Sequence, residues 1–192
     1  MSLVKPCAAA AAGALLAACA ALSPAPEVSR APVRFDLLGR VAVNYDGRAF
    51  TSSVRWQHAP ERDEIWLLTP TGQTLAYIVD DAGGATLTGA DQKQYRASNV
   101  ESLTRQALGW ELPLARLGYW VRGEAAPGPA PEDVLRDERS RLAALTQDGW
   151  RIAFVHYPPG EQGGLPRRLD LASGVHEIRL VVDGWRRAGD TP

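Results

Sequence analysis

Residues 33–57, VRFDLLGRVAVNYDGRAFTSSVRWQ, decide the fold because they read as one β-hairpin. Apolar and polar side chains alternate up to Tyr45, which is the period of a strand with one buried face. Asp46 and Gly47 follow, and this pair favours the tight two-residue turn between antiparallel strands. The alternation then resumes and reaches Trp56. The stretch therefore predicts two strands of an antiparallel sheet.

Short strand-like segments separated by turn residues continue on both sides of a proline-rich loop at 125–131. Four of them follow the first hairpin, at 64–69, 74–79, 85–88 and 92–96. Four more follow the loop, at 142–147, 150–157, 165–171 and 175–185. The Asp148–Gly149 pair is the strongest single hairpin signal in the chain. About ten antiparallel strands at this spacing are typical of a long sheet that curls.

Between the two groups of strands the hydrophobic period becomes that of a helix. Asn99 suits the N-cap of a helix over 100–108, and Gly109 suits its C-cap. A second helix is predicted over 114–121. The apolar sides of these helices need a large surface to cover, and the sheet offers the only one.

The fold predicted from these elements is mainly β with inserted helices, an α+β protein. We expect an open antiparallel half-barrel of about ten or eleven strands. A helical lid at about 99–122 would cover it and enclose an apolar cavity.

Large apolar side chains are available to line this cavity. The candidates are Trp56, Trp66, Tyr77, Leu103, Leu108, Leu117, Trp120, Trp150, Tyr157 and Trp185. Any one of them is more often plain core than a ligand-binding residue. Taken together, a lidded half-barrel lined by leucine, tryptophan and tyrosine suits a lipid chain.

The N-terminal segment has the three parts of a secretory signal: Lys5, an apolar run, and small residues before a cut site. The run ends in Leu16-Ala17-Ala18-Cys19, which resembles a bacterial lipobox, where the cysteine is lipidated and the chain is cut before it. An ordinary signal peptide and a short membrane helix are the alternatives. A dozen or so apolar residues are too few to span a bilayer, which needs about 20.

The lipobox interpretation sets the organisation of the chain. We expect a signal peptide at 1–18, a lipidated N-terminus and tether at 19–32, one domain at 33–188 and a tail at 189–192. The prolines of the tether favour an extended conformation. The residue after the cysteine is Ala20 and not aspartate, and in this the sequence resembles lipoproteins that are sent on to the outer membrane.

The remaining composition argues against other functional classes. The 192 residues carry 21 Lys and Arg against 22 Asp and Glu, so a basic surface for nucleic acid is not expected. The three histidines lie in separate segments, as His58, His156 and His176. No nucleophile elbow, zinc motif or phosphate loop occurs in the sequence. The acidic pairs Asp80–Asp81 and Glu132–Asp133 are expected in solvated turns. We therefore expect no enzyme activity, metal ion or other cofactor.

Several short motifs, in order along the chain, carry a resemblance to a known family. They are Phe35-x-Leu37-x-Gly39-Arg40, Trp56, Pro70-x-Gly72, Leu108-Gly109-x-x-x-Pro113, Trp120-x-x-Gly123, Gly149-Trp150, Leu165-Pro166-x-x-Leu169 and Trp185. With the lipobox, this order and spacing resemble the LolB family of outer-membrane lipoproteins over essentially the whole mature chain.

The resemblance implies a monomeric, lipid-anchored receptor in the outer membrane of a Gram-negative bacterium, facing the periplasm. Such a receptor accepts client lipoproteins from the periplasmic carrier LolA and holds their acyl chains in the cavity. It then inserts them into outer-membrane lipid. A lipid-anchored periplasmic scaffold, or a binder of another hydrophobic ligand, is the alternative, and a scaffold would fill the cavity with its own side chains.

The family also implies a membrane-insertion loop, which maps here to Pro70, Thr71 and Gly72. Some relatives carry leucine where this chain has Thr71, and threonine offers the bilayer only a methyl group. Burial of a leucine side chain contributes about 1.5 to 3 kcal/mol, so the departure weakens the expected insertion. An ordinary hairpin turn explains the same residues equally well.

Basic side chains are expected to dock the carrier if its mouth is acidic. The candidates are Arg40, Arg55, Arg105, Arg116 and Arg122, each of which has a solvated surface residue as its simpler interpretation. Arg40 follows Gly39 in the first strand, and an inward side chain there would act as a lid latch. An outward, solvated Arg40 is the simpler interpretation.

Overall fold

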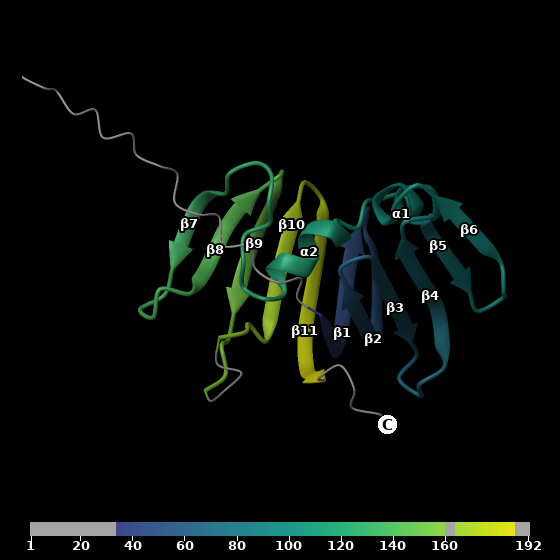
Figure 1. The fold of residues 1–192 in the computed structure, drawn as a ribbon, viewed down its shortest axis with the longest axis horizontal. Helices are drawn as coiled ribbons and strands as arrows, with labels where there is room; N and C mark the ends of the chain where they lie inside the picture. Colours follow the sequence, from purple (N-terminus) through teal and green to yellow (C-terminus); the bar gives the residue numbers. More distant parts are fainter. Residues whose placement is uncertain (1–33, 160–163, 187–192) are drawn as a thin grey trace, which may run out of the picture. The chain divides into compact units, whose positions relative to one another are not determined.

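The computed structural model describes residues 34–159 and 164–186, and within them one large sheet carries two helices. The strands are β1 (Phe35–Tyr45), β2 (Arg48–Ala59), β3 (Arg62–Leu68), β4 (Thr74–Asp81), β5 (Gly84–Gly89), β6 (Gln94–Ala97), β7 (Glu132–Arg136), β8 (Leu142–Gln147), β9 (Trp150–Val155), β10 (Arg168–Ser173) and β11 (His176–Arg186). Their order across the sheet is β6-β5-β4-β3-β2-β1-β11-β10-β9-β8-β7 (Figure 1). The sheet is open, with β6 and β7 at its two edges. The predicted fold class of an open antiparallel sheet with two helices is confirmed.

The first and last strands pair at the centre of this sheet. In the register of β1, Leu37 lies opposite Trp56 of β2 and Trp185 of β11. The β1–β11 pairing has a register shift at Leu38/Gly39. The strands that precede the helices and the strands that follow them therefore form one continuous sheet.

Residues opposite one another in register point to the same side of a sheet, so the register assigns each side chain to a face. One row of partners crosses five strands and consists of Leu37, Trp56, Ile65, Ile78 and Leu87. Beyond β1 the same face continues through Leu180, Leu169 and Phe154. All eight side chains are buried. This apolar side is called the helix-covered face below, and the opposite side the open face.

Two helices cover the apolar side, α1 (Val100–Leu108) and α2 (Leu114–Trp120) (Figure 1). The side chain of Asn99 caps α1 by accepting a 2.8 Å hydrogen bond from the Ser102 amide. Contacts with β5 and β6 place α1 at one end of the sheet. A Cβ atom on Gly118 of α2 would meet the rings of His58 and Trp56 at 3.8 to 4.0 Å, so α2 lies over β2. Neither helix is long and apolar enough to cross a membrane.

Two acidic pairs are corrected by the structure, because both lie in strands rather than turns. Asp80 and Asp81 end β4, where they pair with β3. Glu132 and Asp133 begin β7, an edge strand that the sequence did not predict. The β7 sequence EDVLR is exposed along its whole length and pairs with β8 through two register shifts. Because β7 has no buried face, its sequence need not alternate apolar and polar residues. The alternation that predicted the other strands was therefore missing.

The close approach of β11 to Gly39 makes a direct test of the β1–β11 pairing. A Cβ atom at Gly39 would lie 2.3 Å from the Val181 carbonyl oxygen, so alanine forces the two strands apart. We expect Gly39→Ala to lower the free energy of unfolding by about 1 to 3 kcal/mol in urea denaturation. Gly184→Ala, across the same register shift but with open space around it, is the matched control. Equal effects of the two substitutions would contradict the pairing described here.

Candidate functional site

The space between the helices and the sheet is the candidate site, and its centre is packed. Leu103 of α1, Trp120 of α2 and Leu37 of β1 each have 0% relative exposure. A side chain with no accessible surface borders no void as large as a water molecule. The predicted apolar cavity is therefore closed at these positions, because the facing apolar surfaces bury one another.

The sequence-predicted cavity residues separate into two groups. Those on the helix-covered side are buried or packed against the core, and they are Trp56, Leu103, Leu117, Trp120, Trp150, Tyr157 and Trp185. The side chain of Leu108 lies outside the described residues, as does the predicted lipidation site Cys19.

Trp66 and Tyr77 are corrected, because they lie on the open face. Trp66 pairs in register with Arg55 and Tyr77, whereas its neighbour Ile65 pairs with Trp56. The two rings stack with centroids 5.0 Å apart, and the Arg55 guanidinium lies over Trp66. They cannot line a space beneath the helices.

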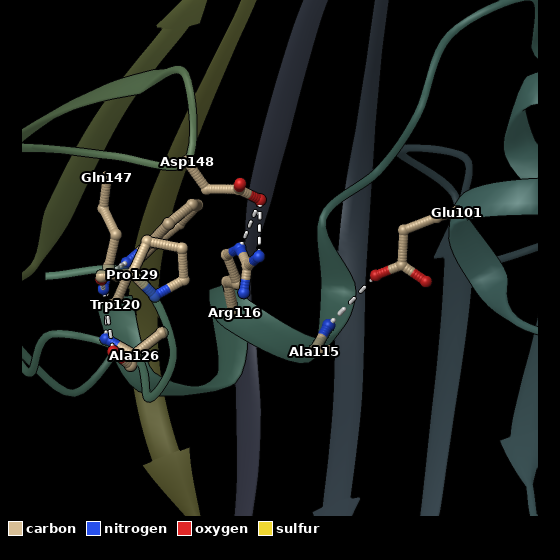
Figure 2. Close-up of polar contacts among 8 residues, drawn as sticks. All are labelled: Glu101, Ala115, Arg116, Trp120, Ala126, Pro129, Gln147 and Asp148. Atoms are coloured by element: carbon tan, nitrogen blue, oxygen red, sulfur yellow. Dashed lines mark hydrogen bonds and ion pairs between the residues drawn. The ribbon is translucent and has the colours of Figure 1, made fainter.

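Gln147 at the end of β8 is a residue of the site that sequence reasoning missed. Its side chain is almost fully buried and makes four hydrogen bonds (Figure 2). Its Oε1 accepts from the Trp120 indole and from the Ala126 amide, each at 3.0 Å. Its Nε2 donates to the carbonyl oxygens of Ala126 at 2.8 Å and Pro129 at 2.9 Å. This amide therefore fastens α2, and the loop that follows it, to β8.

Two further polar contacts hold the helices at their ends. Arg116 of α2 forms an ion pair with Asp148, with 2.6 Å between Nη2 and Oδ2 (Figure 2). Glu101 of α1 accepts a 3.4 Å hydrogen bond from the Ala115 amide. Because Asp148 directly follows Gln147, both polar contacts of α2 with the sheet lie at one end of β8.

Carboxyl groups gather where α1 begins. Asp63 accepts hydrogen bonds from the Trp56 indole at 2.6 Å and lies 2.8 Å from the His58 ring. Asp80, opposite Asp63 on β4, is partly buried beside it. Burial raises the pKa of Asp80 to about 6, and the negative charges of Asp63 and Glu101 add to the effect. Asp80 therefore carries an unfavourable charge at neutral pH.

The predicted membrane-insertion loop between β3 and β4 is exposed at its tip. Pro70, Thr71 and Gly72 all face solvent, and Gly72 has a φ of +86°. The Thr69 amide donates to the Gln73 carbonyl at 2.8 Å and closes the turn. This geometry is compatible both with a surface loop that enters a bilayer and with an ordinary hairpin turn.

The five candidate docking arginines all have a carboxylate partner. The pairs are Arg40 with Asp183, Arg55 with Asp36, Arg105 with Glu111, Arg116 with Asp148, and Arg122 with Glu124. The latch interpretation of Arg40 is corrected, since its side chain is 64% exposed and bonds Asp183 of the neighbouring strand on the open face. Within 34–159 and 164–186 no cluster of three His, Cys, Asp or Glu side chains could hold a metal ion.

An open antiparallel sheet with helices over its apolar side, behind a lipobox-like N-terminus, defines a class of exported lipoproteins. The family model described as outer membrane lipoprotein LolB matches residues 33–185. The outer-membrane lipoprotein LolB of Nitrosomonas europaea is 42% identical over 161 residues, 81% of this chain and 76% of the relative. That of Chromobacterium violaceum is 37% identical over 179 residues, 90% of this chain and 93% of the relative. This chain belongs to the LolB family. It is a lipid-anchored lipoprotein of the outer membrane, with the receptor role of the Lol pathway.

The raised pKa of Asp80 makes stability depend on pH. Between about pH 4 and 6 the unfolded chain has released this proton and the folded chain has not, so stability falls as pH rises through that window. We expect Asp80→Asn to remove this loss, so that its melting temperature exceeds that of the wild type by more at pH 7.5 than at pH 4. Asp46→Asn, in the exposed β1–β2 turn, is the control and should leave the pH profile unchanged. Parallel wild-type and Asp80→Asn profiles would contradict the assignment.

Proposed function

We propose that this protein takes the acyl chains of lipoproteins from the periplasmic carrier LolA onto its helix-covered face and releases them into the outer membrane. The observation that supports this most strongly is the apolar face itself. It runs from β5 across the sheet to β8, and within residues 34–159 and 164–186 its cover consists of two short helices and their connections. In a chain of the LolB family, that face is the surface suited to a lipid chain.

Acyl chains must pass directly from one apolar surface to another, because their exposure to water costs too much free energy. Each methylene group of an acyl chain contributes about 0.8 kcal/mol when it leaves water, so chains cannot cross the periplasm unprotected. The sequence carries no phosphate-binding loop for a nucleotide. Direction would then come from affinity, which must be weakest for the carrier and strongest for the membrane. No covalent step and no cofactor are needed.

The closed packing gives the helices a second task. An apolar face of this extent, left open to water, would promote association with other proteins. The helices keep it buried until cargo arrives, and acyl chains enter only when part of that cover is displaced. The measured affinity for cargo is therefore the intrinsic affinity reduced by the fraction of molecules that are open.

The ends of the chain fit this role. We propose that residues 1–18 are removed, that Cys19 carries lipid, and that residues 19–32 tether the domain at 33–188, with a tail at 189–192. Fourteen residues of proline-rich sequence would reach about 40 Å if they were extended. That length lets a single domain meet a carrier in the periplasm and still reach the bilayer as a monomer.

Docking is proposed to exchange ion pairs at the helix ends. Arg105 and Arg116 already hold carboxylates of this chain, Glu111 and Asp148, at partly exposed positions. An acidic surface on LolA would compete for the same guanidinium groups. Exposed ion pairs are worth about 0 to 1 kcal/mol each, so such an exchange costs little.

The transfer reaction tests the function directly. Purified LolA loaded with radiolabelled lipoprotein is mixed with this protein in outer-membrane vesicles, and label is followed from the soluble to the membrane fraction. We expect transfer that depends on this protein. No transfer from demonstrably loaded carrier would overturn the receptor proposal and favour the scaffold, which the packed interior also suits.

The insertion loop is tested by Thr71→Glu. A buried charge is costly in a bilayer, so we expect delivery into membranes to fall about tenfold or more while acceptance from LolA changes little. Acceptance is measured as complex formation with the unlipidated Cys19→Ala variant, and delivery as label in vesicles. Ser140→Glu, in the exposed β7–β8 turn at the far edge of the sheet, is the control and should leave both steps intact. Equal loss of both steps in Thr71→Glu would show that this loop does not insert.

A further inference from the structure

We infer that the indole N–H of Trp110 binds a carbonyl group at the head of the cargo's acyl chains, where ester and amide bonds join those chains to the lipoprotein. The inference rests on the proposed function and adds to it which polar part of the cargo is recognised and by which side chain. Two observations carry it, a buried donor without a partner and a pocket that Trp110 lines.

The indole nitrogen of Trp110 is buried and has no hydrogen-bond acceptor within residues 34–159 and 164–186. The whole residue is 6% exposed. Two other buried tryptophans of the helix-covered face both have an acceptor: Trp56 donates to Asp63 at 2.6 Å and Trp120 to Gln147 at 3.0 Å. Buried indole groups ordinarily find a partner, and an unpaired donor destabilises the state that contains it. The free protein therefore holds a donor that a bound acceptor can satisfy.

Trp110 also lines a pocket of about 680 Å³ beside the helix-covered face. The walls of this pocket are α1, the connection at 109–113, α2 and the ends of the β8–β9 and β10–β11 hairpins. Figure 2 shows three of its lining residues, Glu101, Arg116 and Asp148. Pockets for small molecules have volumes of about 300 to 1,000 Å³, so the head of a lipid fits this one.

The position of Trp110 joins this pocket to the apolar core. Its side chain belongs to the core cluster, and its ring centroid lies 6.1 Å from that of Tyr45. Trp150 is likewise a core residue that lines the pocket. The acylated end of a lipoprotein has the same arrangement, with polar carbonyl groups at one end and apolar chains beyond them. A carbonyl group bonded to Trp110 would leave its chain on the apolar side.

The charges of the pocket favour a neutral acceptor. Its lining carries the carboxylates of Glu101, Glu111 and Asp148 against the guanidinium groups of Arg105 and Arg116. Both guanidinium groups are already in ion pairs, with Glu111 and Asp148 respectively. A phosphate group would therefore meet an excess of negative charge, which opposes its binding. Ester and amide carbonyl groups accept hydrogen bonds without a net charge, so an acylated cysteine suits this pocket better than a phospholipid headgroup.

Access to the indole follows from its place in the chain. Trp110 lies in the connection between α1 and α2, which is part of the cover over the apolar face. Under the proposed function cargo displaces part of that cover, and the buried nitrogen then becomes accessible. Because the donor gains an acceptor only in the loaded protein, the hydrogen bond favours the loaded state over the closed one.

Two neutral lipids that differ in their carbonyl groups test the inference. Dioctanoylglycerol has two ester carbonyl groups, whereas dioctylglycerol has chains of the same length joined through ether oxygens. The dissociation constant of each is measured by isothermal titration calorimetry with the unlipidated Cys19→Ala protein. The measurement is repeated after adding Trp110→Phe or, as the matched control, Ser173→Ala, which removes another donor from the lining of the pocket. Comparing both lipids within each protein cancels the effect of a substitution on packing.

We expect the Cys19→Ala protein to bind the ester at least about fivefold more tightly than the ether. Trp110→Phe should reduce this ratio to less than about twofold, and Ser173→Ala should leave it unchanged. The indole N–H proton resonance of Trp110 should move downfield with the ester and not with the ether. That resonance decides the question even if Trp110→Phe fails to fold.

Equal affinity of the Cys19→Ala protein for the two lipids would overturn the inference. A preference that survives Trp110→Phe or disappears in Ser173→Ala would overturn it as well, as would an unmoved Trp110 resonance when the ester is bound. If neither lipid binds, the proposed function itself fails and the inference falls with it, because the apolar face then takes no acyl chain.

Discussion

Keeping water from one apolar side of an open sheet is the constraint on which this structure depends. A closed barrel would shield that side by itself, whereas here α1, α2 and the segments that join them supply the cover. Each large apolar side chain buried beneath them contributes about 1.5 to 3 kcal/mol. The β1–β11 pairing matters for the same reason, because it aligns the apolar rows of both halves on one side. Under the proposed function the cover must also be replaceable, since the cargo is apolar as well.

Local signals predicted the parts of the fold that local chemistry determines. Asp46–Gly47 and Asp148–Gly149 form their turns with positive φ angles, the Asn99 side chain caps α1, and all three lie where expected. The face of Trp66 could not be predicted, because Ile65, Trp66 and Leu67 are apolar in succession and alternation gives no choice between sides. Only the register of the pairing with β2 decides which side Trp66 faces.

The polar centre of the site lay beyond sequence reasoning for a different reason. Gln147 precedes a hairpin turn, where a glutamine is ordinarily solvated. Its burial depends on Trp120 and on Ala126 and Pro129, which come from an adjoining loop more than fifteen residues away. Whether the apolar space is open or filled is likewise a property of packing. The same apolar residues would occur in the sequence whether the space is an open cavity or is filled by side chains.

The two margins of the sheet have a consequence for a protein held at a membrane surface. Long, regular strand edges present unpaired amides and carbonyls that template joining to another sheet. Here β6 has only four residues, and β7 meets β8 through two irregularities of register. Neighbouring copies crowded together by their lipids therefore find no straight edge to extend. A fold that leaves its barrel unclosed in this way therefore offers no long, regular edge for polymerisation.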